Sequence, residues 1–157
     1  MAKKQKNYVN NKDFYEAMVE FKKSVNDAEA KGENRPQVPK YIAECITLIA
    51  QRLSHKPNFI NYTFREDMIG DGIENSLRYI DNFNPEKTQN PFAYFTQIIH
   101  YAFLRRIQRE KRQLEIKNKI LERSGFSEVF TDDNNIDGGN YSDYNSIKDG
   151  VHSKLRY

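Results

Sequence analysis

Four acidic residues recur at helical spacing in the middle of the chain. Asp67, Asp71, Glu74 and Asp81 are 4, 3 and 7 positions apart, so they share one face if the segment is helical. Such a face is either a docking surface for a basic partner or a solvated surface, and composition favours neither. Carboxylate catalysis needs groups that converge in a cleft, and no histidine or lysine pattern accompanies these acids. We therefore predict a protein that is not an enzyme and has no catalytic residue.

A second group of interest is the aromatic segment over residues 92–103, which contains five aromatic side chains. Helical spacing predicts that one set of apolar residues packs into a core, while a second set lies largely off that stripe. The predicted core set is Phe92, Phe95, Ile99 and Phe103, and the set off the stripe is Tyr94, Gln97, His100 and Tyr101.

Basic residues follow this aromatic segment directly. Residues 105–123 carry eight bases and three acids, whereas residues 91–104 carry no charged side chain. Rings that stack on bases, next to cations that pair with phosphates, are typical of nucleic-acid binding. A solvated charged helix is the alternative. The candidate DNA-binding residues are Tyr94, Phe95, Gln97, Tyr101, Ala102, Arg105, Arg106, Arg109, Lys111 and Arg112.

Metal sites are poorly supported. The segment Asp133 to Gly138 matches the first half of a calcium-binding loop, but Tyr144 stands where the loop needs a bidentate glutamate. One cysteine, Cys45, and three isolated histidines do not make a zinc site. We predict no metal and no cofactor.

Length and composition favour one domain in a reducing compartment. The chain has 157 residues, with 25 basic and 22 acidic side chains, and its single cysteine excludes an internal disulfide framework. No apolar run approaches the roughly 20 residues of a membrane span, and the first residues lack the apolar stretch of a signal peptide. We expect a cytoplasmic protein that does not bind membranes.

Apolar periodicity predicts two helices in the first third of the chain. Phe14, Met18, Phe21 and Val25 form one stripe, with Asn10 or Asn11 as N-cap. After a linker over residues 31–39 with two prolines and a glycine, the second stripe comprises Ile42, Ile46, Ile49 and Leu53. Pro57 is expected to end that helix.

Two further helices are expected after residue 62. Thr63 and Glu66 fit a capping box, followed by a stripe of Ile69, Ile73, Leu77 and Ile80, and Asn84-Pro85 breaks this helix. Asn90-Pro91 has the residues of an N-cap and a first helical position. The fourth helix is predicted to continue to Arg123 without an internal glycine or proline, before Gly125.

Strand signals are weak throughout, so the predicted fold class is all-α, a compact helical bundle with a long basic C-terminal helix. We expect a flexible basic N-terminus over 1–10, a helical domain over 11–123 and an acidic, disordered tail over 124–157. The tail prediction rests on its abundance of Asp, Asn, Gly and Ser.

The order of these segments resembles domain 2 of bacterial sigma factors. DMIGDGIENSLRYIDNF, over residues 67–83, is similar to the polymerase-binding helix of that family, whose pattern is approximately D-L-I-Q-E-G…L…A-[VIL]-D-[KR]-F. NPFAYFT, over residues 90–96, continues the family order into the promoter-melting and −10-recognition helix. With NYVNNKD over residues 7–13, the match extends to the late-transcription sigma factors of T4-type bacteriophages.

The resemblance implies a function. A factor of this family binds the host RNA polymerase core through the clamp coiled coil and directs it to late promoters with an AT-rich −10-like element. Phe95 falls where the family has an aromatic that supports base capture, and Ala102 and Arg105 fall where the upstream −10 base pair is recognised. The residues implied to bind polymerase are Asp67, Gly70, Asp71, Ile73 and Glu74. The implied location is the cytoplasm of an infected bacterial host.

Three positions depart from the family pattern. The chain has no tryptophan, and Ile98-Ile99 stand where major sigma factors have a tryptophan pair. Gly70 stands where many have glutamine. The last residues do not match a tail that binds the sliding clamp, so clamp coupling is unsupported, whereas a phage co-activator remains compatible. The alternatives are a free-standing helical DNA-binding regulator and a polymerase-binding phage protein without promoter recognition.

Overall fold

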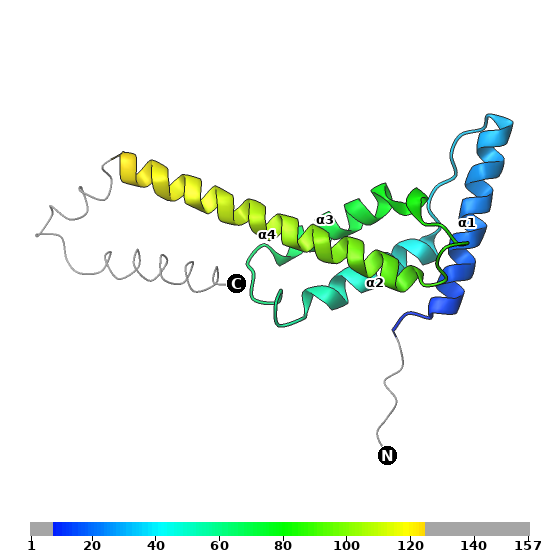
Figure 1. Cartoon of the computed structure of the whole chain (residues 1–157), viewed down its shortest axis with the longest axis horizontal. Helices are drawn as coiled ribbons and strands as arrows, with labels where there is room; N and C mark the ends of the chain where they lie inside the picture. Colours follow the sequence, from blue (N-terminus) through cyan, green and yellow to red (C-terminus); the bar gives the residue numbers. More distant parts are fainter. Residues whose placement is uncertain (1–7, 125–157) are drawn as a thin grey trace, which may run out of the picture. The chain divides into compact units, whose positions relative to one another are not determined.

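The computed structural model describes residues 8–124, and within that range it contains helices and turns but no strand (Figure 1). The predicted all-α class is confirmed. The helices are α1 (Asn11–Lys31), α2 (Lys40–Ser54), α3 (Arg65–Arg78), a 3-10 turn η1 (Ile80–Asn82) and α4 (Pro91–Arg123). The tail predicted to be disordered, the expected stop at Gly125 and the calcium-like loop lie outside the described residues.

The chain divides into two units, Met1–Leu104 and Arg105–Tyr157. The first unit contains α1, α2, α3, η1 and the part of α4 up to Leu104, and the second contains the rest of α4. The sequence predicted one domain over 11–123, whereas the boundary between the units falls inside α4. That helix is continuous in Figure 1, as expected from a segment without internal glycine or proline.

Both ends of α1 are capped, the first by one of the two asparagines that the sequence predicts. The side chain of Asn10 accepts a hydrogen bond from the backbone nitrogen of Lys12 at 3.1 Å. Gly32 has φ 69° and donates to the carbonyls of Ala28 and Glu29, a conformation that favours glycine at a helix C-terminus. The predicted face of Phe14, Met18, Phe21 and Val25 is buried.

The N-terminus becomes ordered earlier than predicted. Val9 is buried, and the Tyr8 ring contacts Phe92 edge-on at 5.7 Å between centroids and lies under the Arg52 guanidinium at 5.4 Å. The prediction of a flexible segment over 1–10 is therefore wrong for residues 8–10. Composition missed this because two isolated apolar residues give no periodic signal.

The core of the first unit is formed by α2 and its neighbours. The predicted stripe of Ile42, Ile46, Ile49 and Leu53 is buried, and α2 contacts both α1 and α3. Figure 1 shows α1 running crosswise to α2. Burial of four branched side chains on one helix contributes about 1.5–3 kcal/mol each, which holds α2 at the centre of the unit.

The start of α3 differs from the prediction. The helix begins at Arg65 with Phe64 at the N-cap, and no side chain caps it. The predicted capping box of Thr63 and Glu66 is therefore wrong, since the helix begins one residue too late for Thr63 to be the cap. Glu66 lies in the first turn, where a carboxylate interacts favourably with the helix dipole.

The buried face of α3 also differs from the predicted stripe. Met68, Gly72 and Ser76 are buried, whereas Ile69 and Ile73 are half-buried and Leu77 is exposed. Ile80, the last member of the predicted stripe, is buried but belongs to η1. The helix is rotated so that Met68 and two small residues, not its isoleucines, face the core.

A close approach between α3 and α4 explains this rotation. A Cβ on Gly72 would lie 2.9 Å from Cγ2 of Ile99 and 3.1 Å from Cε1 of Phe103. The Ser76 hydroxyl is buried without cost because it donates to the carbonyl of Gly72 at 2.8 Å. Two small residues one turn apart thus let the bulky side chains of α4 pack against the α3 backbone.

The beginning of α4 matches the prediction closely. The side chain of Asn90 accepts from the backbone nitrogen of Ala93 at 3.0 Å, and Pro91 is the first helical residue. Asn11 of α1 adds a second cap by accepting from the backbone nitrogen of Phe92 at 3.1 Å. None of the helices in the described range is long and apolar enough to cross a membrane.

Candidate functional site

The acidic face of α3 is only partly as the sequence predicted. Asp67, Gly70 and Glu74 are exposed, and Glu74 accepts from Arg78 one turn later at 2.7 Å. Asp71 and Ile73 are half-buried. Three of the five residues proposed for polymerase binding therefore lie on the open surface, and the other two border it.

Asp81 does not belong to this face, so its predicted place beside the other acids is wrong. It lies in η1, where both carboxylate oxygens accept from the Arg35 guanidinium at 2.6 and 2.7 Å. This bidentate pair joins the loop after α1 to the turn after α3. α3 ends at Arg78, and the helical register used for the prediction stops there.

Two of the candidate DNA-binding residues are in the core. Phe95 is fully buried and stacks on Phe14 at 5.5 Å between ring centroids, and Ala102 is also buried. Neither side chain can contact DNA in this structure, and both predictions need correction. For Phe95 the helical stripe already indicated burial, and only the family resemblance suggested base contact.

Tyr94 and Tyr101 have different surroundings, although both were predicted to lie off the core stripe. The Tyr94 hydroxyl donates to the carbonyl of Tyr79 at 2.7 Å, and its ring contacts Phe83 and Phe95 edge-on. Burial raises the pKa of Tyr94 above its usual range. Tyr101 is 51% exposed, so it is the ring of this pair that offers an open stacking surface.

The open surface of this part of α4 includes one residue that the sequence reasoning missed. Gln97 is exposed as predicted, and Leu104 is 37% exposed. Their spacing of 4 and 3 positions from Tyr101 puts all three on one helical face. Leu104 could have been found from that spacing, since it falls on the same face as the polar residues and off the Phe95 stripe.

A series of ring contacts supports this open face from beneath. His100 contacts Phe59 edge-on at 5.7 Å, and Phe59 contacts Phe103 in the same way at 5.2 Å between centroids. Tyr101 lies next to His100 at 6.0 Å. Edge-to-face pairs of this kind contribute about 0.5–1.5 kcal/mol each beyond burial of area, so the exposed tyrosine adjoins a packed aromatic group.

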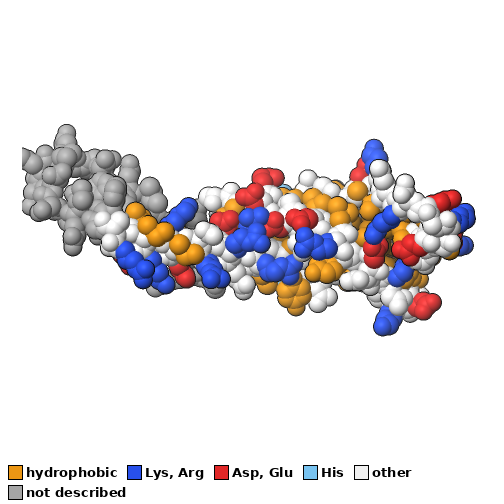
Figure 2. Space-filling view, turned by 90° about the horizontal axis from the view of Figure 1, so that it is seen from above, with side chains coloured by type: hydrophobic (Ala, Val, Ile, Leu, Met, Phe, Trp, Pro, Cys, Tyr) orange, Lys and Arg blue, Asp and Glu red, His pale blue; other side chains and the backbone are white. Residues whose placement is uncertain are grey.

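Most of the predicted basic residues of the second unit lie on the open surface of α4. Arg105, Arg109 and Arg112 are exposed, whereas Lys111 and Arg106 are half-buried, and Arg106 pairs with Glu110 at 3.4 Å. Figure 2 shows Lys and Arg side chains together with hydrophobic ones on the part of α4 next to the grey atoms. This helix can offer several cations to a polyanion.

No metal centre is found among residues 8–124, where no three His, Cys, Asp or Glu side chains come together. Cys45 is buried, and burial together with the neighbouring Glu44 raises the pKa of its thiol, opposed by a hydrogen bond with Tyr41. These surroundings make the thiol a poor nucleophile.

Two comparisons with known sequences give no match. No family model matches the chain, and no curated protein sequence matches it. Function must therefore be inferred from the residues and from their placement.

Proposed function

We propose that the chain is a sigma-type initiation factor of phage late transcription, which binds the host RNA polymerase core and directs it to an AT-rich −10-like element. The support is the resemblance over residues 41 to about 115 and the order of its parts along the chain. A docking segment, an aromatic segment and a basic segment follow one another, and each is helical in the described residues.

The observation that carries the proposal is the division of α3 into two faces. Gly72 and Ser76 hold one face against α4, and Asp67, Gly70 and Glu74 lie on the surface. An acidic face held in one orientation suits a basic coiled coil, because complementary charges speed association and set its register. Gly70 leaves open space at the centre of the face, into which a partner side chain fits.

Promoter opening is assigned to α4. Unstacking a base pair step costs a few kcal/mol, and stacking a base on an aromatic ring returns about 1–3 kcal/mol. Tyr101 offers that ring, with Gln97 and Leu104 on the same face, while Arg109 and Arg112 supply contacts to phosphates that do not depend on sequence. The factor itself needs no catalytic group, because the polymerase forms the phosphodiester bonds.

Run-off transcription tests the whole proposal. Host core polymerase on a supercoiled late promoter should give a specific transcript only when the protein is added. Specific binding to promoter duplex without polymerase would identify a free-standing regulator instead. Core binding without any transcript would identify a polymerase-binding protein that does not recognise promoters.

A charge reversal tests the docking face separately. Asp67→Lys should weaken core binding at least tenfold, equal to about 1.4 kcal/mol. Glu20→Lys is the matched control, since it changes the charge equally at an exposed position of α1. Equal core affinity for the two variants would refute the assignment of this face.

A further inference from the structure

The part of α4 in the second unit has an exposed stripe that mixes cations and isoleucines. Its members follow one another at intervals of three and four residues, which places them within about 80° of the helix circumference. All of them are exposed. We call this set the basic–apolar stripe, and it comprises Arg109, Arg112, Ile116, Ile120 and Arg123.

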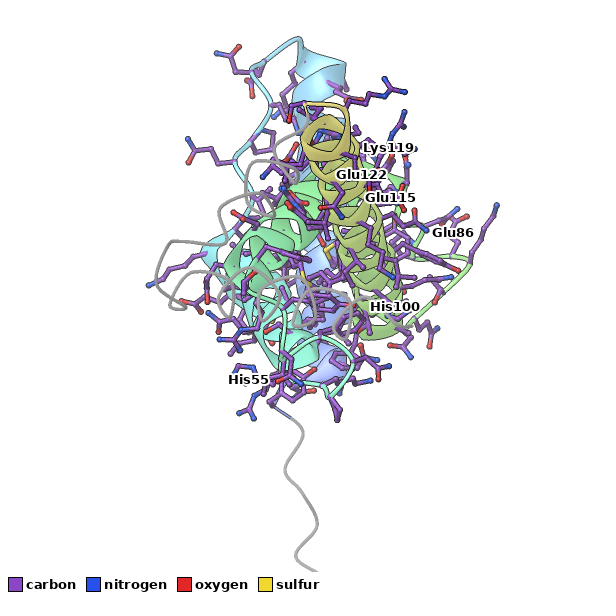
Figure 3. All side chains as sticks on the ribbon, turned by 90° about the vertical axis from the view of Figure 1, so that its left-hand side faces the viewer. His55, Glu86, His100, Glu115, Lys119 and Glu122 are labelled. Atoms are coloured by element: carbon purple, nitrogen blue, oxygen red, sulfur yellow. The ribbon has the colours of Figure 1, made fainter. Side chains whose placement is uncertain are left out.

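Acidic residues are excluded from the stripe. Glu110 lies on another side of the helix, where it pairs with Arg106 at 3.4 Å. Glu115 and Glu122 extend from the same side of α4 as Lys119, at the edge of the stripe (Figure 3). Glu115 follows Arg112 by three residues and Glu122 directly precedes Arg123, so acids flank the stripe on this side. The stripe itself has three arginines and no acid, which leaves it positive.

The two isoleucines indicate what kind of occupant the stripe fits. Ile116 is 42% exposed and Ile120 is 60% exposed, and one turn separates them, so they form a continuous apolar patch. Phosphates pair with the arginines but gain nothing from isoleucine. A peptide that combines carboxylates with apolar side chains satisfies both parts of the stripe.

The chain itself contains such a peptide, beginning three residues after Arg123. Residues 126–133 are FSEVFTDD, with two phenylalanines, one valine and three acids. Eight residues span up to about 26–29 Å when extended, whereas Arg109 lies about 21 Å from Arg123 along the helix. The segment is therefore long enough to run back along the entire stripe.

We infer that residues 126–133 bind the basic–apolar stripe of α4, with Phe126, Val129 and Phe130 on the isoleucines and the three acids on the arginines. A segment joined to its site by a short linker acts at an effective concentration of about 1 mM, so even a weak contact is populated. The inference goes beyond the proposed function, because it concerns a contact within this chain. Its consequence is competition with nucleic acid for Arg109 and Arg112.

A fluorescent variant tests the contact directly. The chain has no tryptophan, so Phe130→Trp introduces a single indole into the full-length protein. With the segment on the stripe, the indole emission is blue-shifted, and acrylamide quenches it less than an indole that stays in water. Ile116→Ser with Ile120→Ser, added to this variant, should shift the emission to the red and restore full quenching.

The control variant introduces the same number of serines into α4 as the isoleucine variant and has the same net charge. Glu115→Ser with Lys117→Ser also places two serines at exposed positions of α4, leaves the net charge unchanged and spares the stripe, so the emission should stay blue. Red-shifted emission from the Phe130→Trp variant with both isoleucines present would overturn the inference. Blue emission that persists without the isoleucines would place the segment elsewhere and would also overturn it.

Binding to duplex DNA tests the consequence without polymerase or promoter. Glu128→Gln, Asp132→Asn and Asp133→Asn together should raise the affinity of the full-length protein for DNA by about tenfold, because three carboxylates no longer compete with phosphates. Asp137→Asn, Asp143→Asn and Asp149→Asn remove the same charge outside the segment and should raise it less. Equal effects of the two triple variants would show general charge repulsion instead of competition for the stripe. A failed transcription assay leaves both measurements interpretable.

Discussion

In the part of α4 up to Leu104, the side chains of Phe95, Ile99 and Phe103 are completely buried, whereas between Arg105 and Arg123 only Ile107 is buried. Packing therefore determines the orientation of the first part and leaves few of its side chains for recognition. The second part has its cations on the surface, and its composition is a better guide to what it can bind. One continuous helix thus combines a structural element with a charged surface.

Truncating a buried ring should give the largest difference between the two parts. Phe95→Ala should lower the free energy of unfolding by about 3–5 kcal/mol, because it opens a cavity beside Phe14. Lys117→Ala, at an exposed position of the second part, should change it by less than about 0.5 kcal/mol. Urea unfolding followed by circular dichroism measures both. A small loss for Phe95→Ala would mean that Phe95 is not in the core.

The two glycines of α3 test the packing of the first part of α4. Gly72→Ala should destabilise the protein by about 1–3 kcal/mol, because the new methyl group overlaps Ile99 and Phe103. Gly70→Ala has nothing within 4 Å and should stabilise it by about 1 kcal/mol through helix propensity. The shifts of the melting temperature should therefore have opposite signs. Shifts of the same sign would contradict the close approach of the two helices.

The sequence fails to predict which face of α3 is buried, and the size of the side chains explains this failure better than their hydrophobicity. In α3 the strongest apolar residues are Ile69, Ile73 and Leu77, so a periodicity argument assigns the core to them. The structure buries Gly72 and Ser76 because only small residues allow α4 to approach at this distance. A single sequence does not reveal which neighbour a helix will meet, and hence which of its faces must be small.

Local sequence signals were enough to predict the features that depend only on residues close by in the chain, such as the starts of helices. Asn10 and Asn90-Pro91 act through bonds within one turn, and the first residues of α1 and α4 follow from them. The candidate site was predictable to the same extent. The exposed arginines of α4 were identified from composition, while the burial of Ala102 and the bond between Tyr94 and Tyr79 depend on tertiary packing.

Phosphate contacts should distinguish the second part of α4 from other charged surfaces. Arg109→Ala with Arg112→Ala should weaken the polymerase–promoter complex about tenfold and lower the salt dependence by about one unit of slope for each lost contact. The loss should be similar for different promoter sequences. Lys12→Ala with Lys23→Ala removes two exposed charges from α1 and should leave the slope unchanged. If the slope falls equally in both variants, net charge alone is responsible.

The smallest effect concerns Tyr94 and Tyr101, which lie two turns apart in the first part of α4. Tyr94→Phe should cost about 0.5–1.5 kcal/mol at neutral pH, because the hydrogen bond to the carbonyl of Tyr79 is lost. Tyr101→Phe should change the free energy of unfolding by less than about 0.5 kcal/mol, since Tyr101 is on the surface.

Tyr94→Phe should also differ from the parent protein in alkaline solution, because burial raises the pKa of Tyr94 in the folded protein. Above the ordinary tyrosine pKa of about 10, the unfolded chain loses a proton that the folded protein still holds. The unfolded state then binds fewer protons, so the free energy of unfolding decreases as the pH rises through this window, and the full stability is present only below it. Tyr94→Phe should show a smaller decrease than the parent protein. Urea unfolding at pH values on both sides of 10 measures the difference, and parallel curves for the two proteins would mean that Tyr94 ionises as freely as a tyrosine in water.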